Sequence, residues 1–436
     1  MAITGRAGAA ALAGVLVMLA FRSWLAVLGV AVAIGAGIGA DLLLAAPVRP
    51  LRLSRSGDTA VRLGETAEVA LTIANPGRRV LRGLIRDAWP PSAGARPRPT
   101  SASIRGGGQT VITTTLTPTR RGDRAAVSVT VRSTGPLGLA ARQGRHAVPW
   151  TVRALPPFHS RRHLPEKLSR LRELDGMHRS LIRGQGSEFD SLREYVPGDD
   201  VRSIDWRGTA RRQEVLVRTW RPERDRRIVV VLDTGRTSAG RVATIGREGG
   251  IPRLDSSMDA ALLLAALAIR AGDRIDLLAF DQRLRARVVA APRNDTLRAF
   301  ASAMARVDAE LVELDSAAMV AAILAHARQR CLVVLLTDLN PAALGEGLLP
   351  RLPLLTSRHL VVLGSVADPR LDELAAGRGE AGIVYAAAAA ERARAGRSQL
   401  AAQLRQQGVT VVDASPDRFP PALADAYLDL KAAGQL

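Results

Sequence analysis

Two acidic residues stand at positions where a ligand-binding edge is expected. Asp233 ends the apolar run RIVVVLD, and Asp338 follows the apolar run CLVVLLT. Both runs have the length and composition of strands buried on both faces, and ligands bind beside the carboxyl ends of such strands. We therefore expect Asp233 and Asp338 to share one edge of a sheet, where they could serve a metal-assisted hydrolase.

A second group of carboxylates lies between Arg183 and Trp220, in a segment that we call the signature block. It reads RGQGSEFDSLREYVPGDDVRSIDWRGTARRQEVLVRTW, and its acids are Glu188, Asp190, Glu194, Asp199 and Asp205. These acids could form an acid/base pair or a metal site. Arginines within a few residues of each acid favour bidentate arginine–carboxylate pairs in a folded polar segment instead.

The signature block also carries aromatic and turn-forming residues, which a solvated charged tail would lack. The positions expected to fold the block or to dock a partner are Gly186, Glu188, Phe189, Arg193, Tyr195, Gly198, Asp199, Arg202, Asp205, Trp206 and Arg211. We expect the block to fasten the preceding β-rich region to the following domain. Replacing Asp205 or Trp206 by alanine should then destabilise that junction.

The elements that would position Asp233 and Asp338 alternate between strand and helix over residues 227–436. Strands are predicted at 227–233, 274–280, 284–290, 331–337, 359–364 and 409–412, the third as an antiparallel hairpin partner. Helices are predicted at 257–271, 295–307, 317–329, 391–407 and 420–432. This alternation predicts a mostly parallel sheet with helices on both faces.

The first fifty residues predict a membrane location. Ala7–Phe21 and Trp24–Ala46 are apolar, and the second is long enough to cross a bilayer. We interpret residues 1–50 as a transmembrane hairpin, with a secretory signal peptide as the alternative. Arg6 before the hairpin and Arg49 after it place both ends in the cytoplasm, which gives a two-pass protein of the inner or plasma membrane. Asp41 is expected to reach from the second span toward water.

Two further regions separate the hairpin from the C-terminal half. Residues 51–155 contain short alternating segments divided by glycine, proline and asparagine, which predicts a β-sandwich. Residues 156–226 contain an amphipathic helix over 164–174, followed by the signature block. The fold class is therefore multidomain: two transmembrane helices, a β-sandwich and an α/β domain.

The composition restricts the classes of partner and chemistry. The formal net charge is +20, but Lys167 and Lys431 are the only lysines. A general arginine bias explains this charge as well as a binding patch would, so nucleic acid is disfavoured as a partner. The single cysteine, Cys331, reads as a small apolar residue of a strand, which excludes a disulfide framework.

The segment DTGRT from Asp233 to Thr237 resembles the D-x-S-x-S metal motif of von Willebrand factor A domains. The resemblance implies a divalent cation held by oxygen ligands, for which Mg²⁺ is suited. Asp233, Thr237 and Asp338 match three of the five expected ligands, whereas Gly235 and Leu314 replace the other two. This degenerate site favours no bound cofactor and leaves Mg²⁺ as the alternative. Arg236 could replace the cation by pairing with Asp233 or Asp338.

The signature block, LDTGRT, MDAALLLAALAIRAGDRIDLLAF and the terminal AYLDLKAAG together resemble the bacterial domain-of-unknown-function 58 family. The resemblance implies membrane segments, a β-rich region and a von Willebrand A-like domain. It also implies association with MoxR-type AAA+ ATPases, and it implies no reaction.

Three functions follow as hypotheses. The first is a membrane-anchored, non-enzymatic adaptor that works with a MoxR-type AAA+ ATPase in protein assembly or cell-envelope maintenance. The second is a metal-assisted hydrolase that uses Asp233 and Asp338. The third is a protein that binds anionic lipid or nucleic acid through its arginines.

Overall fold

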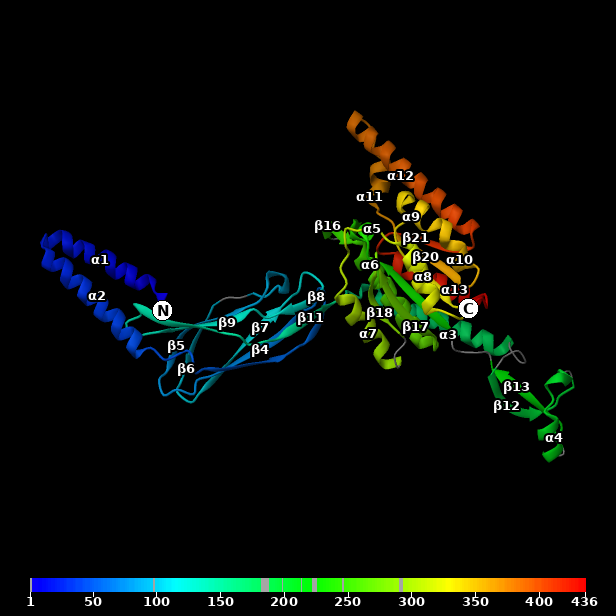
Figure 1. Ribbon diagram of the computed structural model, residues 1–436, viewed down its shortest axis with the longest axis horizontal. Coiled ribbons are helices and arrows are strands. Elements are labelled where there is room, and N and C mark those ends of the chain that lie inside the picture. The colour runs from blue at the N-terminus through cyan, green and yellow to red at the C-terminus, as the bar shows by residue number, and fades with distance from the viewer. Residues whose placement is uncertain are drawn as a thin grey trace. The chain divides into compact units, whose positions relative to one another are not determined.

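The computed structural model describes residues 2–96, 99–181, 188–197, 199–212, 214–221, 226–244, 247–289 and 293–436. The chain divides into two compact units, Met1–Leu155 and Pro156–Leu436 (Figure 1). The first unit contains two apolar helices and an all-β region. The second contains a six-stranded sheet with helices on both faces.

The all-β region of the first unit consists of three sheets. A five-stranded sheet has the order β1-β10-β9-β5-β6, and two three-stranded sheets have the orders β2-β4-β7 and β3-β11-β8. The strands are β1 (Ala2–Ile3), β2 (Arg52–Gly57), β3 (Ala60–Arg62), β4 (Ala67–Ala74), β5 (Leu81–Ala88), β6 (Thr100–Ile104), β7 (Gln109–Leu116), β8 (Gly122–Ala125), β9 (Ser128–Thr134), β10 (Ala140–His146) and β11 (Thr151–Leu155). A short 3₁₀ helix, η1 (Pro91–Ala93), follows β5.

Strict alternation of buried and exposed residues gives this region its core. Along β4, Ala67, Val69, Leu71 and Ile73 are fully buried while the residues between them are not. Leu71 and Ile73 pack with residues of β5, β6 and β9, so the three-stranded and five-stranded sheets share one core. The period of two that predicts a strand therefore also places its apolar face against the second sheet.

One helix of the first unit is long and apolar enough to cross a membrane. This helix is α2 (Trp24–Leu44), whereas α1 (Gly5–Phe21) is a shorter apolar helix of 17 residues. The two helices are in contact, and a Cβ on Gly14 would lie 2.4 Å from Val30 Cγ1. A glycine is needed there because any side chain would push the helices apart.

Asp41 does not reach toward water, which corrects the expectation from the sequence. Its side chain is completely buried, and its carboxylate accepts hydrogen bonds from the backbone N–H groups of Leu137, Leu139 and Ala140 at 2.8, 2.5 and 3.0 Å. Arg142 adds a bond from Nε to the carbonyl oxygen of Leu42 at 2.7 Å. The acid near the end of α2 therefore fixes the helix to the start of β10.

The sheet of the second unit is parallel except at one edge. Its order is β18-β17-β14-β19-β20-β21, and only β18 runs antiparallel to its neighbour. The strands are β14 (Arg227–Asp233), β17 (Arg274–Phe280), β18 (Leu284–Val288), β19 (Leu332–Leu336), β20 (Leu360–Val366) and β21 (Val409–Ala414). The predicted parallel sheet with a hairpin at its edge is confirmed.

Helices cover both faces of this sheet (Figure 1). On one face lie α6 (Arg253–Ala271), α7 (Arg293–Ala305) and α13 (Phe419–Ala432), which contact one another through α6. On the other face, α8 (Ser316–His326), α9 (Pro341–Gly347), α10 (Leu352–Thr356) and α12 (Ala381–Gln406) pack on Val229, Val231, Val333 and Val361. The central strands are apolar throughout because both of their faces are buried.

Further elements complete the second unit. They are η2 (His159–His163), α3 (Leu164–Leu181), β12 (Glu188–Glu194), η3 (Val201–Ser203), α4 (Trp206–Arg212), β13 (Leu216–Arg221), α5 (Arg236–Ala239), β15 (Arg241–Thr244), β16 (Arg247–Pro252), η4 (Leu349–Arg351) and α11 (Arg370–Ala375). The sequence predicted the helix at 164–174 but neither the β15–β16 hairpin nor the β12–β13 hairpin.

The bonds to Asp41 lead to a prediction about stability. Asp41→Ala leaves three backbone N–H groups without their acceptor, so we expect the free energy of unfolding of the first unit to fall by about 2–4 kcal/mol. Thermal and urea unfolding of the full chain in detergent measures this loss. Glu65→Ala, which removes an exposed acid, is the matched control and should change little. Equal effects of the two substitutions would contradict the assigned role of Asp41.

Candidate functional site

Asp233 and Asp338 lie at the carboxyl edge of the parallel sheet, as predicted. Asp233 is the last residue of β14, and Asp338 follows β19, which pairs directly with β14. Both side chains are buried. A buried carboxylate is stable only when donors replace the water it has lost, so the partners of each acid decide what this edge can do.

Three donors surround Asp233. Its Oδ2 accepts from Thr337 Oγ1 at 2.6 Å and from Thr237 Oγ1 at 3.1 Å, and its Oδ1 accepts from the backbone N–H of Gly235 at 2.7 Å. All three donors are uncharged. Burial raises the pKa of Asp233, the nearby charge of Asp338 adds to the increase, and the three hydrogen bonds oppose it.

Two arginines neutralise Asp338. Arg253 Nη1, at the start of α6, lies 3.1 Å from Oδ2, and Arg397 Nη1, on α12, lies 2.7 Å from Oδ1. Arg253 Nη1 also donates to the carbonyl oxygen of Thr237 at 2.9 Å. The two guanidinium groups thus connect helices from opposite faces of the sheet to one carboxylate. We call Asp338, Arg253 and Arg397 the arginine-filled centre.

Arg397 joins two further groups at the same edge. Its Nη2 donates to Ser365 Oγ at 2.9 Å and to Asp413 Oδ1 at 2.7 Å, on β20 and β21. Burial alone would lower the pKa of Arg397, but the charges and hydrogen bonds of Asp338 and Asp413 outweigh burial and raise it. The guanidinium is therefore a permanent charge that holds the ends of three adjacent strands together.

Arg236, the arginine that the sequence led us to expect at this site, is not one of the two arginines that pair with Asp338. Arg236 pairs with Glu313 on an exposed surface and contacts neither Asp233 nor Asp338 among the interactions of the described residues. Arg236 was expected to pair with these acids because it is close to Asp233 in the sequence. The two arginines that do pair with Asp338 are Arg253 and Arg397, which lie 85 and 59 positions from it in the sequence. Thr337 was also not predicted as a residue of this site. Its position directly before Asp338 in the sequence does indicate that it lies at the same edge of the sheet.

The residues at this edge do not fit a divalent cation. The oxygens of Asp233 already accept three hydrogen bonds, and each oxygen of Asp338 faces a guanidinium group. Within the described part of the chain, no group of three or more His, Cys, Asp and Glu side chains is arranged to hold a metal ion. Of the degenerate ligand set, Thr237 Oγ1 donates a hydrogen bond to Asp233 Oδ2, and Asp338 is paired with arginines. We derive no metal-dependent step at this site.

The signature block forms a hairpin with its own polar contacts. Strands β12 and β13 pair antiparallel, with an irregularity between Phe189 and Ser191. Arg193 binds Asp199 through two hydrogen bonds of 2.8 and 2.5 Å, and this pairing lowers the pKa of Asp199. Tyr195 joins the hairpin through its backbone N–H, which donates to the carbonyl oxygen of Val215 at 2.8 Å.

Asp205 organises the start of α4. Its Oδ1 accepts from the backbone N–H groups of Arg207 and Gly208 and from Arg218 Nη2, each at 3.2–3.3 Å. The pairing with Arg218 is the largest cause of the lowered pKa of Asp205. Asp205 is therefore a structural residue of the hairpin, because its carboxylate accepts backbone hydrogen bonds at the start of a short helix.

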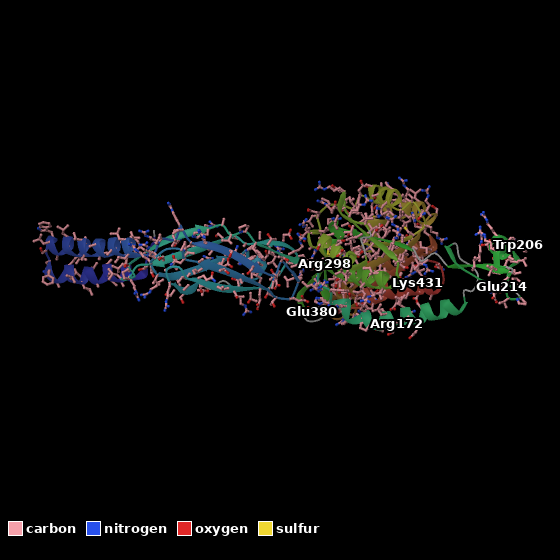
Figure 2. All side chains as sticks on the ribbon, turned by 90° about the horizontal axis from the view of Figure 1, so that it is seen from below. Arg172, Trp206, Glu214, Arg298, Glu380 and Lys431 are labelled. Carbon is pink, nitrogen blue, oxygen red and sulfur yellow. The ribbon has the colours of Figure 1, made fainter. Side chains whose placement is uncertain are left out.

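Trp206, in contrast, lies on the surface. Its side chain is 68% exposed, and Figure 2 shows it on the signature block together with Glu214. The exposed apolar side chains around it in the sequence are Leu192, Val196, Val201 and Val215. The side chains of Arg202, Arg207 and Arg211 are exposed, and their guanidinium groups have no hydrogen-bond or ion-pair partner among the described residues. We call these apolar and arginine residues, with Trp206, the Trp206 surface.

Some predicted positions cannot be compared with the structure. Gly186 and Gly198 lie outside the described residues, and for Glu188 and Phe189 only the backbone pairing in β12 is described. Cys331 is buried directly before β19, and burial raises the pKa of its thiol to about 11. A thiol with this pKa is protonated and unreactive near neutral pH.

These observations define a multidomain, mixed α/β protein with one long apolar helix near its N-terminus. A family model described as "Protein of unknown function DUF58" matches residues 191–403, from β12 into α12. Uncharacterized proteins of Mycobacterium bovis and Mycobacterium tuberculosis are 31% identical to this chain over 206 residues. That alignment covers 46% of this chain and 61% of each relative, so the chain spans about three fifths of the relatives' length.

Comparisons with solved structures give low similarities. The CARDB domain of a Pyrococcus furiosus protein aligns with a TM-score of 0.19 and 15% identity, over 24% of this chain and 87% of that domain. A β-glucosidase from Listeria innocua aligns with a TM-score of 0.15 and 17% identity, over 24% of this chain and 16% of the enzyme. Similarities at this level carry no conclusion about function.

The arginine-filled centre leads to a prediction about stability and metal. Arg397→Met removes one of two cations from Asp338, so the free energy of unfolding should fall by about 2–4 kcal/mol. Arg394→Met on the same helix removes exposed ion pairs with Glu391 and Asp372 and should cost under about 1 kcal/mol. Urea unfolding of the full chain measures both. Millimolar Mg²⁺ should leave wild-type melting unchanged, and a rise in melting temperature would contradict the centre's assignment.

Burial of Asp233 leads to a prediction about pH. The folded chain binds this proton more tightly than the unfolded chain, so stability falls as pH rises from the ordinary carboxyl pKa, about 3.9, to the raised value. The side chain of the Asp233→Asn variant does not titrate, so this variant does not lose stability in that way. Its free energy of unfolding, relative to wild type, should increase with pH across that window and then stay constant.

Urea unfolding from about pH 4 to about pH 8 measures this difference. Glu346→Gln, at an exposed position of α9, is the control and should follow the wild type at every pH. An Asp233→Asn variant that loses stability relative to wild type as pH rises would show that the Asp233 charge is favourable in the fold.

Proposed function

We propose that this protein is a membrane-anchored, non-enzymatic adaptor that docks a protein partner through the Trp206 surface. The partner that we propose is a MoxR-type AAA+ ATPase, in keeping with the resemblance of the signature block to the domain-of-unknown-function 58 family. The work of the pair would be protein assembly or maintenance of the cell envelope. Exposure of Trp206 is the observation that carries this proposal.

The Trp206 surface has the chemistry of a docking site. Trp206 and three valines of the block, Val196, Val201 and Val215, are each exposed, and we propose that they form one apolar interaction surface. The acids Asp199 and Asp205 are paired within the hairpin, whereas the guanidinium groups of Arg202, Arg207 and Arg211 have no partner among the described residues. Trp and Arg are the residue types that dominate binding energy at protein interfaces.

The hydrolase alternative receives less support. It requires Asp233 and Asp338 to hold a metal ion or to exchange protons, yet Asp338 is paired with two arginines and Asp233 with uncharged donors. We propose that the C-terminal unit is a von Willebrand A-like domain in which an internal arginine–carboxylate contact replaces the cation. Binding of anionic lipid or nucleic acid remains the third proposal, and its support is limited to the net charge of +20.

We propose a two-pass topology for the membrane anchor. Helix α1 is in contact with α2, where Gly14 lacks a side chain and lets the helices approach, and a second span would return the chain to the side on which it began. The soluble regions would then be cytoplasmic, as the arginines at both ends of the hairpin favour. A single anchor at α2, or a signal sequence, is the alternative.

The docking proposal predicts separate effects for two neighbouring residues. Trp206→Ala should change the melting temperature by less than about 2 °C, because the side chain is exposed, and should reduce partner capture at least about fivefold. Asp205→Ala should lower the melting temperature, because it removes the acceptor at the start of α4. Capture of the AAA+ ATPase from native membranes, with ATP or a non-hydrolysable analogue, measures docking.

Tyr385→Ala is the matched control for loss of an exposed aromatic side chain. Tyr385 lies on α12 and is 79% exposed, so its replacement should alter neither melting nor capture. The adaptor proposal fails if wild-type protein retrieves no AAA+ ATPase under either nucleotide condition. The role of the Trp206 surface fails if Trp206→Ala and Tyr385→Ala retrieve the ATPase equally.

A further inference from the structure

A hollow of about 520 Å³ lies on the outer face of the five-stranded sheet, within the first unit. Its lining comes mainly from β5, β9 and β10. Ile85, Val129 and Val131 of β5 and β9 belong to the core, so the side chains that alternate with them point away from it. The volume lies within the range of pockets for small ligands, and Arg86 and Arg145 on its walls are exposed to solvent.

The register of the three strands places two arginines on either side of a threonine. Arg86 of β5 is opposite Thr130 of β9, and Thr130 is opposite Arg145 of β10. Neighbouring strands are roughly 4.8 Å apart, so the Cα atoms of the two arginines lie about 10 Å apart with Thr130 between them. All three side chains line the hollow. Both guanidinium groups can therefore reach a group that is bound over Thr130.

The other polar side chains of the lining are arranged to leave donors available. Ser128 Oγ accepts a hydrogen bond from Arg145 Nε at 2.8 Å, which leaves the two Nη groups of Arg145 without a partner among the described residues. Gln143 Oε1 accepts from Arg132 Nε and Nη2 at 3.1 and 3.0 Å, which leaves the amide N–H groups of Gln143 as donors. The side chains around the hollow therefore offer hydrogens to an acceptor.

Acidic side chains are absent from this outer face. Every residue of the five strands is described, and the only acid among them is Asp87, which is buried in the core and pairs with Arg55. In the neighbouring β3-β11-β8 sheet, by contrast, Arg153 is paired with Asp123. Four like charges repel one another, so an anion that binds among them is stabilised. The arginines that share the outer face by strand alternation are Arg82, Arg86, Arg132 and Arg145.

The number of charges and donors indicates which anion fits. A phosphate monoester carries nearly two negative charges at neutral pH and has three acceptor oxygens, which match two guanidinium groups and the hydroxyl of Thr130. A carboxylate has one charge and two oxygens, which a single arginine can satisfy. The five strands contain no Phe, Tyr or Trp, so the face lacks the stacking platform that single-stranded nucleic acid needs.

The position of the hollow along β10 favours a soluble ligand. The contact with α2 lies at the start of this strand, where the N–H of Ala140 binds Asp41. Arg145 is five residues further on, which corresponds to about 17 Å along the strand. The hollow is thus remote from the end of the apolar helix, where the head group of a lipid would lie.

We propose that this hollow binds the phosphate group of a soluble phosphate monoester. Arg86 and Arg145 pair with the phosphate oxygens, and Thr130 Oγ1 and the amide of Gln143 donate hydrogen bonds to them. Arg132 and Arg82 add to the attraction without contacting the ligand. The site is independent of the Trp206 surface and of the adaptor role.

Equilibrium dialysis against labelled glycerol 3-phosphate at about pH 7.5 tests the proposal, with the full chain in nanodiscs made only of phosphatidylcholine. The probe should bind saturably, with one molecule per chain. Glycerate, which has a similar size and a single charge, should compete at least about tenfold more weakly. Near pH 5 the phosphate takes up its second proton, since its pKa is about 6, and binding should weaken about tenfold.

Substitutions separate this site from the general attraction of a basic protein for anions. Arg86→Gln and Arg145→Gln should each weaken binding about tenfold, and Thr130→Val about threefold, since each removes a partner of the phosphate. Arg120→Gln removes an exposed arginine of the same unit, between β7 and β8, and should bind as the wild type does. Melting of each variant confirms that the compared proteins are folded.

Four results would overturn the proposal. They are no saturable binding of glycerol 3-phosphate, equal competition by glycerate, equal affinities of Arg86→Gln and Arg120→Gln, and stronger displacement of the probe by a different class of anion. Vesicles that contain phosphatidic acid represent lipid head groups, and a single-stranded oligonucleotide represents nucleic acid. If either displaces the probe at a lower phosphate concentration than unlabelled glycerol 3-phosphate does, the natural ligand is not a soluble monoester.

Discussion

The second unit depends on how its buried carboxylates are neutralised. The carboxyl edge of a parallel sheet collects acids from neighbouring strands, and a buried acid without a partner would destabilise the fold by several kcal/mol. Here the charge on Asp338 is balanced by Arg253 and Arg397, which lie on helices at opposite faces of the sheet. Sheet and helices are therefore connected through one charged contact, and the same contact removes the electrostatic reason for a cation to bind.

Hydroxyl groups and arginines perform different tasks at this edge. Thr237 and Thr337 stabilise Asp233 without supplying charge, so the pKa of that acid remains raised. Arg397 supplies a full charge to Asp338 and Asp413 together. Two neighbouring acids thus occupy different electrostatic environments, although both follow apolar strands of similar composition.

The sequence predicted the elements better than it predicted the contacts between them. Long apolar runs such as RIVVVLD fixed the positions of Asp233 and Asp338, because burial on both faces leaves little choice of structure. Strand β5 has a weaker pattern, because only Leu81, Ile85 and Asp87 are buried among less buried neighbours. Arg253 and Arg397 could not be chosen among 59 arginines, because nothing local distinguishes an arginine that reaches a distant acid. Asp41 was misjudged for the same reason, since its donors lie nearly one hundred residues away.

The three bonds to Asp41 have a mechanical consequence. A helix that is joined to a folded region by a flexible linker rich in glycine and serine can rotate independently of that region. Near the end of α2, the carboxylate of Asp41 instead accepts hydrogen bonds from the backbone at the start of β10, and Arg142 donates one to the carbonyl oxygen of Leu42. The helix and the five-stranded sheet are therefore joined directly by hydrogen bonds. A force or torque applied to the sheet is transmitted to α2, so the helix and the sheet move together.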